Sequence, residues 1–218
     1  MNLKNYKDPA MLNLSKNPDK EIKAYFWKPF DASRVYASSG DISEGTGNDS
    51  SVINVYDVTQ VKHIQLVARM SCSKATLVDF AYATYEFLKL YCFPPFIVES
   101  NGVGSGFIDI LLNTYNYPME KMFYEQAISP NGKYGEKTYG VKSKNKTKLE
   151  ACMFLNELIT TPDIDISIPD ELLVNEMGTF VRKNTSNSIT FNAKDKCHDD
   201  YMMTWIWGMY LLFADTIQ

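Results

Sequence analysis

The pattern of hydrophobic and polar positions predicts strands in the first third of the chain. Residues 52–56 alternate well enough for a strand, and residues 35–39 and 63–70 are predicted to be two further strands. Gly, Asn and Asp residues separate the first two of these segments, which is typical of a hairpin connection. We therefore expect an antiparallel sheet to begin here.

A helical period follows the third strand. Apolar residues recur at i, i+3 and i+4 over residues 73–91, which predicts a helix that ends before a Pro-Pro pair. Residues 96–98 are wholly apolar, as expected for a central strand covered on both faces. A glycine-rich turn then leads into a helix that extends to about Tyr115.

The second half of the chain mixes helical and strand patterns. The expected elements are a helix over 148–159, a strand over 164–168, a helix over 169–181, a strand over 188–193 and a helix over 201–213. This order of elements predicts an α/β fold in which a mixed sheet carries helices on both faces.

The first 33 residues are rich in Lys, Asn, Asp and Pro and contain only scattered apolar residues. We expect residues 1–33 to form a linker or arm, anchored by the aromatic residues 25–27, and residues 34–218 to form the ordered domain. No signal peptide is expected, because residues 1–20 are polar. The longest apolar run, 201–213, is shorter than the ~20 residues that a membrane span needs.

Two adjacent carboxylates, Asp199 and Asp200, stand directly before the apolar helix 201–213. An Asp at a helix start commonly caps free backbone N–H groups, which accounts for one of the pair. Burying a carboxylate costs free energy unless a cation binds it, so a bound divalent metal is the alternative interpretation. The sequence around this pair leaves both interpretations open.

Two more acids lie where expected strands end. Asp41 follows the first strand, and Glu99 comes directly after the apolar strand 96–98. Glu44 and Asp49 share a turn with Asp41, and such a turn is often simply solvated. The glycines after Glu99 form GxGxG rather than GxGxxG, so a dinucleotide site is poorly supported.

Composition narrows the classes of function. Hydrophobic residues make up 45% of the chain and charged residues 22%, as in soluble globular proteins. The four cysteines contain no CxxC pair, which argues against a zinc ribbon and favours a reducing compartment. Because the net charge is −4, any nucleic-acid binding has to use a local basic patch.

The one concentrated basic segment spans residues 133–148 and holds six of the 22 basic residues. A run of lysines is often no more than a solvated face. The segment is also the natural place for contacts to nucleic-acid phosphates. The lysines expected to bind DNA are Lys142, Lys144, Lys146 and Lys148.

The candidate acids supply hard oxygen ligands, and no HExxH, GxSxG or P-loop pattern accompanies them. Oxygen ligands favour Mg²⁺ or Mn²⁺. Two such ions held a few Å apart can assist the cleavage of a phosphodiester.

Four segments in this order resemble one known family. They are residues 40–49 (GDISEGTGND), 97–104 (IVESNGVG), 139–148 (YGVKSKNKTK) and 198–203 (HDDYMM). Together they are similar to the C-terminal nuclease domain of the large terminase subunit of tailed double-stranded DNA bacteriophages. The resemblance covers the chain from about Arg34 to its end.

This resemblance implies a ribonuclease H-like fold and a two-metal endonuclease that cuts concatemeric viral DNA during genome packaging. It implies that Asp41, Glu99 and Asp199 are catalytic metal ligands. Asp200 would be a second or outer ligand, and Glu44 and Asp49 would assist.

Further partners follow from the same resemblance. They are double-stranded DNA, a packaging ATPase domain, the portal and the small terminase subunit, in the host cytoplasm during viral assembly. This chain has no GxxxxGK[ST] and no room for the ATPase domain, so we expect an isolated nuclease domain or a fragment of a longer protein. Tyr201 occupies a position at which members of that family more usually have an aliphatic residue.

Three other interpretations remain at this point. The chain could be a different ribonuclease H-like nuclease, such as a junction resolvase, or a catalytically silent DNA-binding module of the same fold. A structural protein with a mixed α/β fold is the third. The acidic set argues against a silent module, because negative charge near phosphate would weaken DNA binding.

Overall fold

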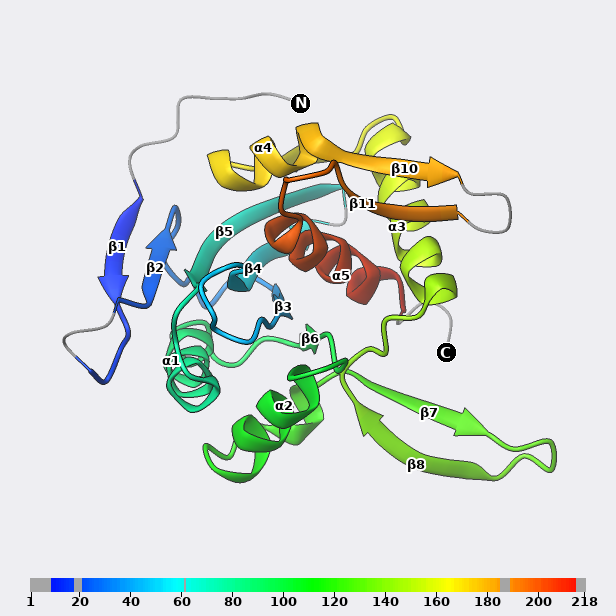
Figure 1. Ribbon diagram of the computed structural model, residues 1–218, viewed down its shortest axis with the longest axis horizontal. Coiled ribbons are helices and arrows are strands. Elements are labelled where there is room, and N and C mark those ends of the chain that lie inside the picture. Colours follow the sequence, from blue (N-terminus) through cyan, green and yellow to red (C-terminus); the bar gives the residue numbers. More distant parts are fainter. Residues whose placement is uncertain (1–8, 18–20, 61, 185–188, 215–218) are drawn as a thin grey trace.

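The computed structural model describes residues 9–17, 21–60, 62–184 and 189–214, and a seven-stranded mixed sheet lies at its centre (Figure 1). The sheet order is β1-β2-β5-β4-β3-β6, and β9 also pairs with β5. The strands are β1 Ala10–Asn13, β2 Lys23–Phe26, β3 Tyr36–Asp41, β4 Ser51–Gln60, β5 His63–Cys72, β6 Phe96–Val98 and β9 Asp165–Ser167.

Helices cover both faces of this sheet, as the sequence predicts. They are α1 Leu77–Lys89, α2 Gly104–Asn113, α3 Asn145–Thr160, α4 Glu171–Thr179 and α5 Asp200–Ala214, with a short 3-10 turn at Met119–Lys121. Helix α1 starts four residues later than predicted, because Thr76 caps it by accepting a hydrogen bond from the Asp79 N–H.

Two hydrophobic clusters hold the layers together. On one face, Ile53 and Val55 of β4 pack with apolar residues of α1 and α2. On the other face, Tyr56 packs with α3 and α5, and its ring lies 5.3 Å from that of Trp205. Trp205 and Trp207 are both fully buried, so α5 is anchored by large apolar side chains over β3 and β4.

The pairing of the first strands confirms the expected antiparallel start: β3 pairs with β4, and β4 with β5. Strand β6 pairs in parallel with β3 and ends the path of the sheet, so its prediction as a central strand is wrong. Its residues are nevertheless fully buried. Helices cover both faces of β6. Two isolated bridges, Phe96 with Met122 and Glu99 with Val141, add backbone pairing at its two ends.

The expected arm contributes to the sheet. Within residues 1–33, β1 and β2 pair with each other, and β2 pairs with residues 68–71 of β5. Ile22 and Ala24 are fully buried, so this segment completes the core on the α1 side. Four-residue strands are too short for a clear alternation, which explains why the pattern does not reveal them. Residues 1–8 lie outside the described residues.

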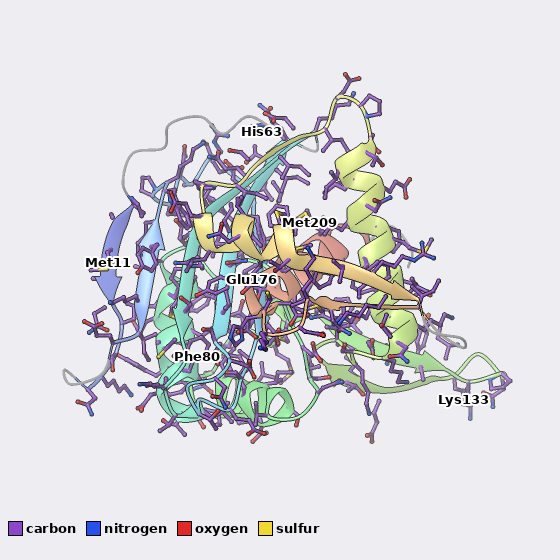
Figure 2. All side chains as sticks on the ribbon, turned by 45° about the horizontal axis from the view of Figure 1, so that its top comes forward. Met11, His63, Phe80, Lys133, Glu176 and Met209 are labelled. Atoms are coloured by element: carbon purple, nitrogen blue, oxygen red, sulfur yellow. The ribbon has the colours of Figure 1, made fainter. Side chains whose placement is uncertain are left out.

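Two hairpins were not predicted, although the sequence did predict the strand that becomes β11. Strands β7 Tyr124–Ile128 and β8 Tyr134–Tyr139 form one, and β10 Phe180–Asn184 and β11 Ile189–Ala193 form the other. The first projects from the body with Lys133 at its far end (Figures 1 and 2). It buries little apolar surface, so its sequence carries no strong alternating pattern. Ser188, the expected start of the last strand, lies outside the described residues.

Within the described part of the chain, no helix is both long enough and apolar enough to cross a membrane.

Candidate metal centre

Asp41 and Glu99 lie on neighbouring parallel strands. Gly40 and Val98 are paired in register, and the Glu99 N–H donates to the Gly40 carbonyl oxygen at 3.3 Å. Asp41 is the last residue of β3 and Glu99 follows β6, so the two carboxylates meet at the same end of the sheet. Both residues are half-buried. This confirms that Asp41 ends a strand, as predicted.

Helix α5 brings the third and fourth acids to this end of the sheet. Its position is fixed by the Ser39 hydroxyl, which donates to the Thr204 carbonyl at 2.6 Å, and by Trp207, whose Nε1–H donates to Glu99 Oε2 at 3.2 Å. Asp199 and Asp200 stand at the start of the helix, over β3 and β4. Burial of the apolar helix therefore determines where its leading carboxylates lie.

The two adjacent aspartates have different partners. Asp200 Oδ2 accepts a hydrogen bond from the Ser50 N–H at 2.7 Å. Asp199 Oδ2 accepts one from the Ala193 N–H at 3.3 Å and lies 3.9 Å from Lys148 Nζ. The pair therefore reaches toward opposite sides of the helix start.

Burial and mutual repulsion change the protonation of these acids. Desolvation, followed by the charges of Glu99 and the two aspartates, raises the pKa of Asp41 well above its usual value. Desolvation also raises the pKa of Glu99, against the hydrogen bond from Trp207. The pKa of Asp200 rises to about 6, chiefly by desolvation. The negative charge of these acids is therefore not fully balanced within the site, and a divalent cation would balance it.

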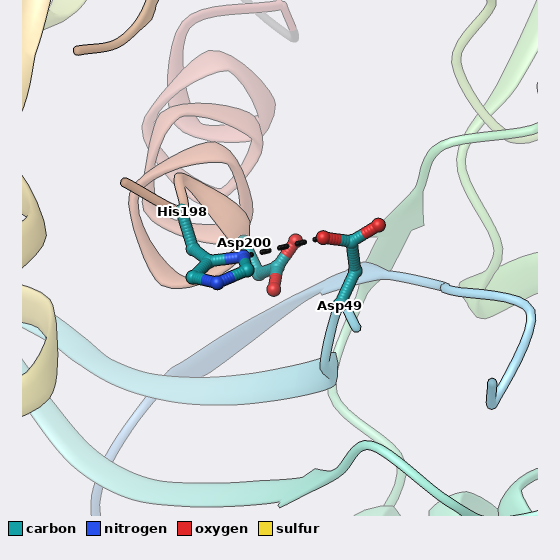
Figure 3. Close-up of side chains that lie close together, drawn as sticks. All are labelled: Asp49, His198 and Asp200. Carbon is teal, nitrogen blue, oxygen red and sulfur yellow. Dashed lines mark hydrogen bonds and ion pairs between the residues drawn. The ribbon is translucent and has the colours of Figure 1, made fainter. Parts of the chain in front are cut away.

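A tighter group forms around Asp200. Among the described residues, Asp49, His198 and Asp200 are the one set of three His, Cys, Asp or Glu side chains whose ligand atoms all lie within 4.8 Å (Figure 3). His198 Nδ1 and Asp49 Oδ1 share a hydrogen bond of 3.3 Å. The donors of this group, two carboxylates and an imidazole, fit a divalent metal.

The structure treats the sequence-predicted acids differently. Asp49 joins Asp200, whereas Glu44 is exposed in the loop between β3 and β4. Asp41, Glu99 and Asp199 are electrostatic neighbours but form no group as tight as that of Asp49. Sequence reasoning missed His198. The one sequence feature that could have indicated His198 as a ligand is its position directly before the two aspartates.

Lys148 belongs with the acids rather than with the exposed lysines. Its side chain is 22% exposed, and its Nζ donates to Asn192 Oδ1 at 3.0 Å as well as lying near Asp199. Its charge lowers the pKa values of Asp41 and Glu99, although by less than desolvation raises them. Lys148 therefore offsets part of the repulsion in the site.

The other three predicted lysines, Lys142, Lys144 and Lys146, are exposed between β8 and the first turn of α3. The backbone here runs along the loop that follows Glu99: Asn101 and Ser143 exchange two hydrogen bonds, at 2.8 and 3.1 Å. Gly140, with φ of +81°, permits this close approach, because a Cβ there would lie 2.8 Å from the Val98 carbonyl oxygen. The basic segment thus flanks the acids.

The glycine-rich turn after Glu99 has a packing role. A Cβ on Gly104 would lie 2.0 Å from the Glu99 carbonyl oxygen, so only glycine allows α2 to begin this close to the strand end. This contact accounts for the glycine without a dinucleotide.

Glu176 of α4, labelled in Figure 2, is a further acid that the sequence did not single out. Its Oε2 accepts a hydrogen bond from the Met202 N–H at 2.9 Å, in the first turn of α5. Desolvation raises its pKa to about 7, and the charges of Asp200 and Asp199 add to the effect. Glu176 therefore caps the helix that carries the aspartates.

The comparison with known proteins rests on structure. No family model and no curated protein matches the sequence. The fold, however, is that of the nuclease domains of large terminases. This confirms, at the level of fold, the resemblance and the ribonuclease H-like mixed sheet predicted from the sequence.

Three of the matching structures are nuclease domains from two phages. The large terminase nuclease of thermophilic phage G20c with bound magnesium has a TM-score of 0.68 at 15% identity, covering 93% of this chain and 98% of that one. The same nuclease with bound cobalt gives 0.66 at 16% identity and the same coverage. The nuclease domain of Thermus phage P74-26 gives 0.62 at 16% identity, covering 85% of this chain and 83% of that one.

Proposed function

We propose that this chain is a metal-dependent endonuclease that cuts double-stranded viral DNA concatemers during genome packaging, as the nuclease domain of a large terminase subunit. The observation that carries the proposal is the meeting of Asp41, Glu99 and the Asp199-Asp200 pair at one end of the sheet. The raised pKa values of Asp41, Glu99 and Asp200 support a site that binds cations. The fold shared with the phage nucleases supports the same function.

The proposed metal ligands are Asp41, Glu99 and Asp199, with Asp200 as a second or outer ligand. Asp49 and His198 extend the donor set on the Asp200 side. The cofactor would be two Mg²⁺ or Mn²⁺ ions, which stabilise both the attacking and the leaving oxygen of a phosphodiester when bound.

The chain's own residues prepare this site. Trp207 orients the Glu99 carboxylate, and the Ser50 N–H orients that of Asp200. Lys148 neutralises part of the acidic charge that would otherwise repel a DNA phosphate. Lys142, Lys144 and Lys146, on the loop beside Glu99, would bind backbone phosphates of the duplex.

The assembly proposed around this domain follows from the same function. The packaging ATPase domain, the portal and the small terminase subunit would be its partners, and the host cytoplasm its place of action.

The test is incubation of the purified chain with supercoiled plasmid. We expect nicked and linear DNA with Mg²⁺ or Mn²⁺ and intact plasmid with EDTA. Equal cutting in EDTA would rule out the metal mechanism, and no cutting under any condition would rule out the nuclease. A cruciform substrate in parallel tests the resolvase alternative, which requires strong preference for the branched DNA.

A separate prediction concerns the exposed lysines. Changing Lys142, Lys144 and Lys146 to Ala should weaken duplex binding regardless of sequence, because fewer counterions are released from the DNA. The slope of log K against log salt should become shallower by about 1 for each lysine that no longer binds a phosphate. Binding measured by fluorescence anisotropy at several salt concentrations checks this. An unchanged slope would assign these lysines to a solvated face.

A further inference from the structure

A cavity of about 780 Å³ opens beside the candidate metal centre. Its walls come from β2, from the end of β5 and from the starts of β4, α4 and α5, and the residues that matter here are Lys23, Tyr25, Arg69, Ser71, Lys74 and Tyr201. Ser50, whose N–H binds Asp200, also lines it, and Tyr201 directly follows Asp200. The cavity and the acids therefore share a wall.

The lining is cationic in a chain of net negative charge. Lys23, Arg69 and Lys74 face a single acidic lining residue, Glu21, which lies 2.7 Å from Lys23 Nζ. Lys74 is exposed and has no ion pair among the described residues. The cavity therefore favours an anion.

Arg69 is built into the floor of this cavity. It is 4% exposed, and its Nη1 donates to both carboxylate oxygens of Asp170 at 2.6 and 2.7 Å. The rings of Tyr25 and Tyr201 lie over the guanidinium, at 4.7 and 4.9 Å. Its buried Nε–H has no hydrogen-bond partner in the described structure, so the guanidinium retains donor capacity.

The register of the sheet aligns this cavity with the acids. Asp41 pairs with Val52, Val52 with Ser71, and Ser71 with Lys23. Directly paired residues project from the same face of a sheet, so the row leads from the metal centre to the cavity. Three strand spacings amount to roughly 15 Å. Successive phosphates of one strand lie farther apart than the ~3.4 Å rise along the helix axis, so this distance corresponds to fewer than about four nucleotides.

We propose that this cavity is a subsite for a backbone phosphate of the DNA strand, within about four nucleotides of the bond cut at the metal centre. The inference rests on the proposed nuclease function and extends its DNA contacts beyond the predicted lysines. Lys74 and Lys23 contact the phosphate, and the tyrosine-covered Arg69, whose charge is paired with Asp170, offers its free Nε–H as a donor beneath it. The row of paired residues makes a DNA strand, rather than a free nucleotide, the expected source of the phosphate.

The test compares two variants with the same change of charge. Lys74→Glu alters the cavity, whereas Lys89→Glu alters an exposed lysine at the end of α1, on the opposite face of the sheet. Duplex binding is measured in EDTA, so that neither metal binding nor cleavage contributes. We expect Lys74→Glu to weaken binding about tenfold more than Lys89→Glu and to make the salt slope shallower by about 1.

A second variant separates binding from loop structure, because the Lys74 side chain also packs near Gly47 in the loop that contains Asp49. Lys23→Gln leaves that loop untouched and should also weaken binding. Equal affinities for Lys74→Glu and Lys89→Glu would overturn the subsite, and so would an effect of Lys74→Glu without one of Lys23→Gln.

Three further outcomes distinguish the sources of phosphate and separate this proposal from the proposed nuclease function. If inorganic phosphate at constant ionic strength raises the Tm of the parent but not of Lys74→Glu, while both bind duplex equally, the cavity holds free phosphate and the DNA assignment fails. A parent that cuts plasmid while Lys74→Glu and Lys89→Glu bind alike leaves the nuclease standing and rejects the subsite. If the parent does not cut plasmid but Lys74→Glu binds duplex more weakly than Lys89→Glu as expected, the nuclease function is rejected and the phosphate subsite stands.

Discussion

Plasmid cleavage by the Asp41→Asn variant should fall by roughly three orders of magnitude, which corresponds to about 4 kcal/mol less transition-state stabilisation. Asparagine keeps the size of the side chain and removes the negative charge that a metal ligand needs. The fold should remain, because relief of repulsion from Glu99 and Asp200 favours the neutral side chain. Initial rates of nicking with Mg²⁺ and with Mn²⁺ measure the effect.

The controls for this prediction are matched in chemistry. Glu99→Gln should lose activity to a similar extent, whereas Glu120→Gln, an exposed acid in the turn after α2, should cut like the parent. Circular dichroism and Tm verify that each variant folds. If Asp41→Asn or Glu99→Gln cuts at near the parent rate, the assignment of that ligand is wrong.

The second large effect concerns stability. In EDTA, we expect the Tm to fall as the pH rises from 5 to 8. The pKa of Asp200 is about 6 and that of Glu176 about 7 in the folded chain, and those of Asp41 and Glu99 are also raised. Unfolded carboxyls titrate near ~4, so between ~4 and ~7 the folded state holds more protons. This contribution to stability is complete below ~4 and disappears as the pH rises through the folded pKa values.

Metal should reverse this trend, because it binds the deprotonated acids. At pH 8 and a metal concentration of about 100 times the Kd, Mn²⁺ should add roughly 2.7 kcal/mol, equivalent to about 5–10 °C in Tm. The gain should shrink at pH 5.5, where protons compete. Thermal melts with Mn²⁺ and EDTA at both pH values provide the measurement, with Asp200→Asn expected to reduce both effects. An equal Mn²⁺ gain at both pH values would contradict protonation of the site.

Much of the candidate site could be read from the sequence. Asp41 and Glu99 each follow a recognisable strand, and the backbone pairing of β3 with β6 does place them side by side. Asp199 and Asp200 precede an apolar run that had to be a buried helix. These predictions rest on the local pattern of apolar and polar residues. That pattern is reliable here because burial of apolar faces contributes most to the stability of the fold.

Other parts of the site depended on contacts that no local pattern contains. Glu176 reaches the first turn of α5 only because α4 packs against that helix. His198 and Asp49 are 149 residues apart in the chain and meet through the loop before β4. Lys148 lies in a run of lysines that look alike in sequence, yet the packing of α3 turns it toward Asp199.

The sequence by itself determined the α/β class, the main strands and helices, and the set of acids, because each depends on the periodic burial of apolar residues or on residue chemistry. Only the tertiary structure decided that β1 and β2 belong to the sheet, that β6 ends it, and which acids share a site. Strand pairing and helix packing set those outcomes, and both join residues far apart in the chain. The free energy of such contacts depends on which surfaces meet, which local periodicity does not specify.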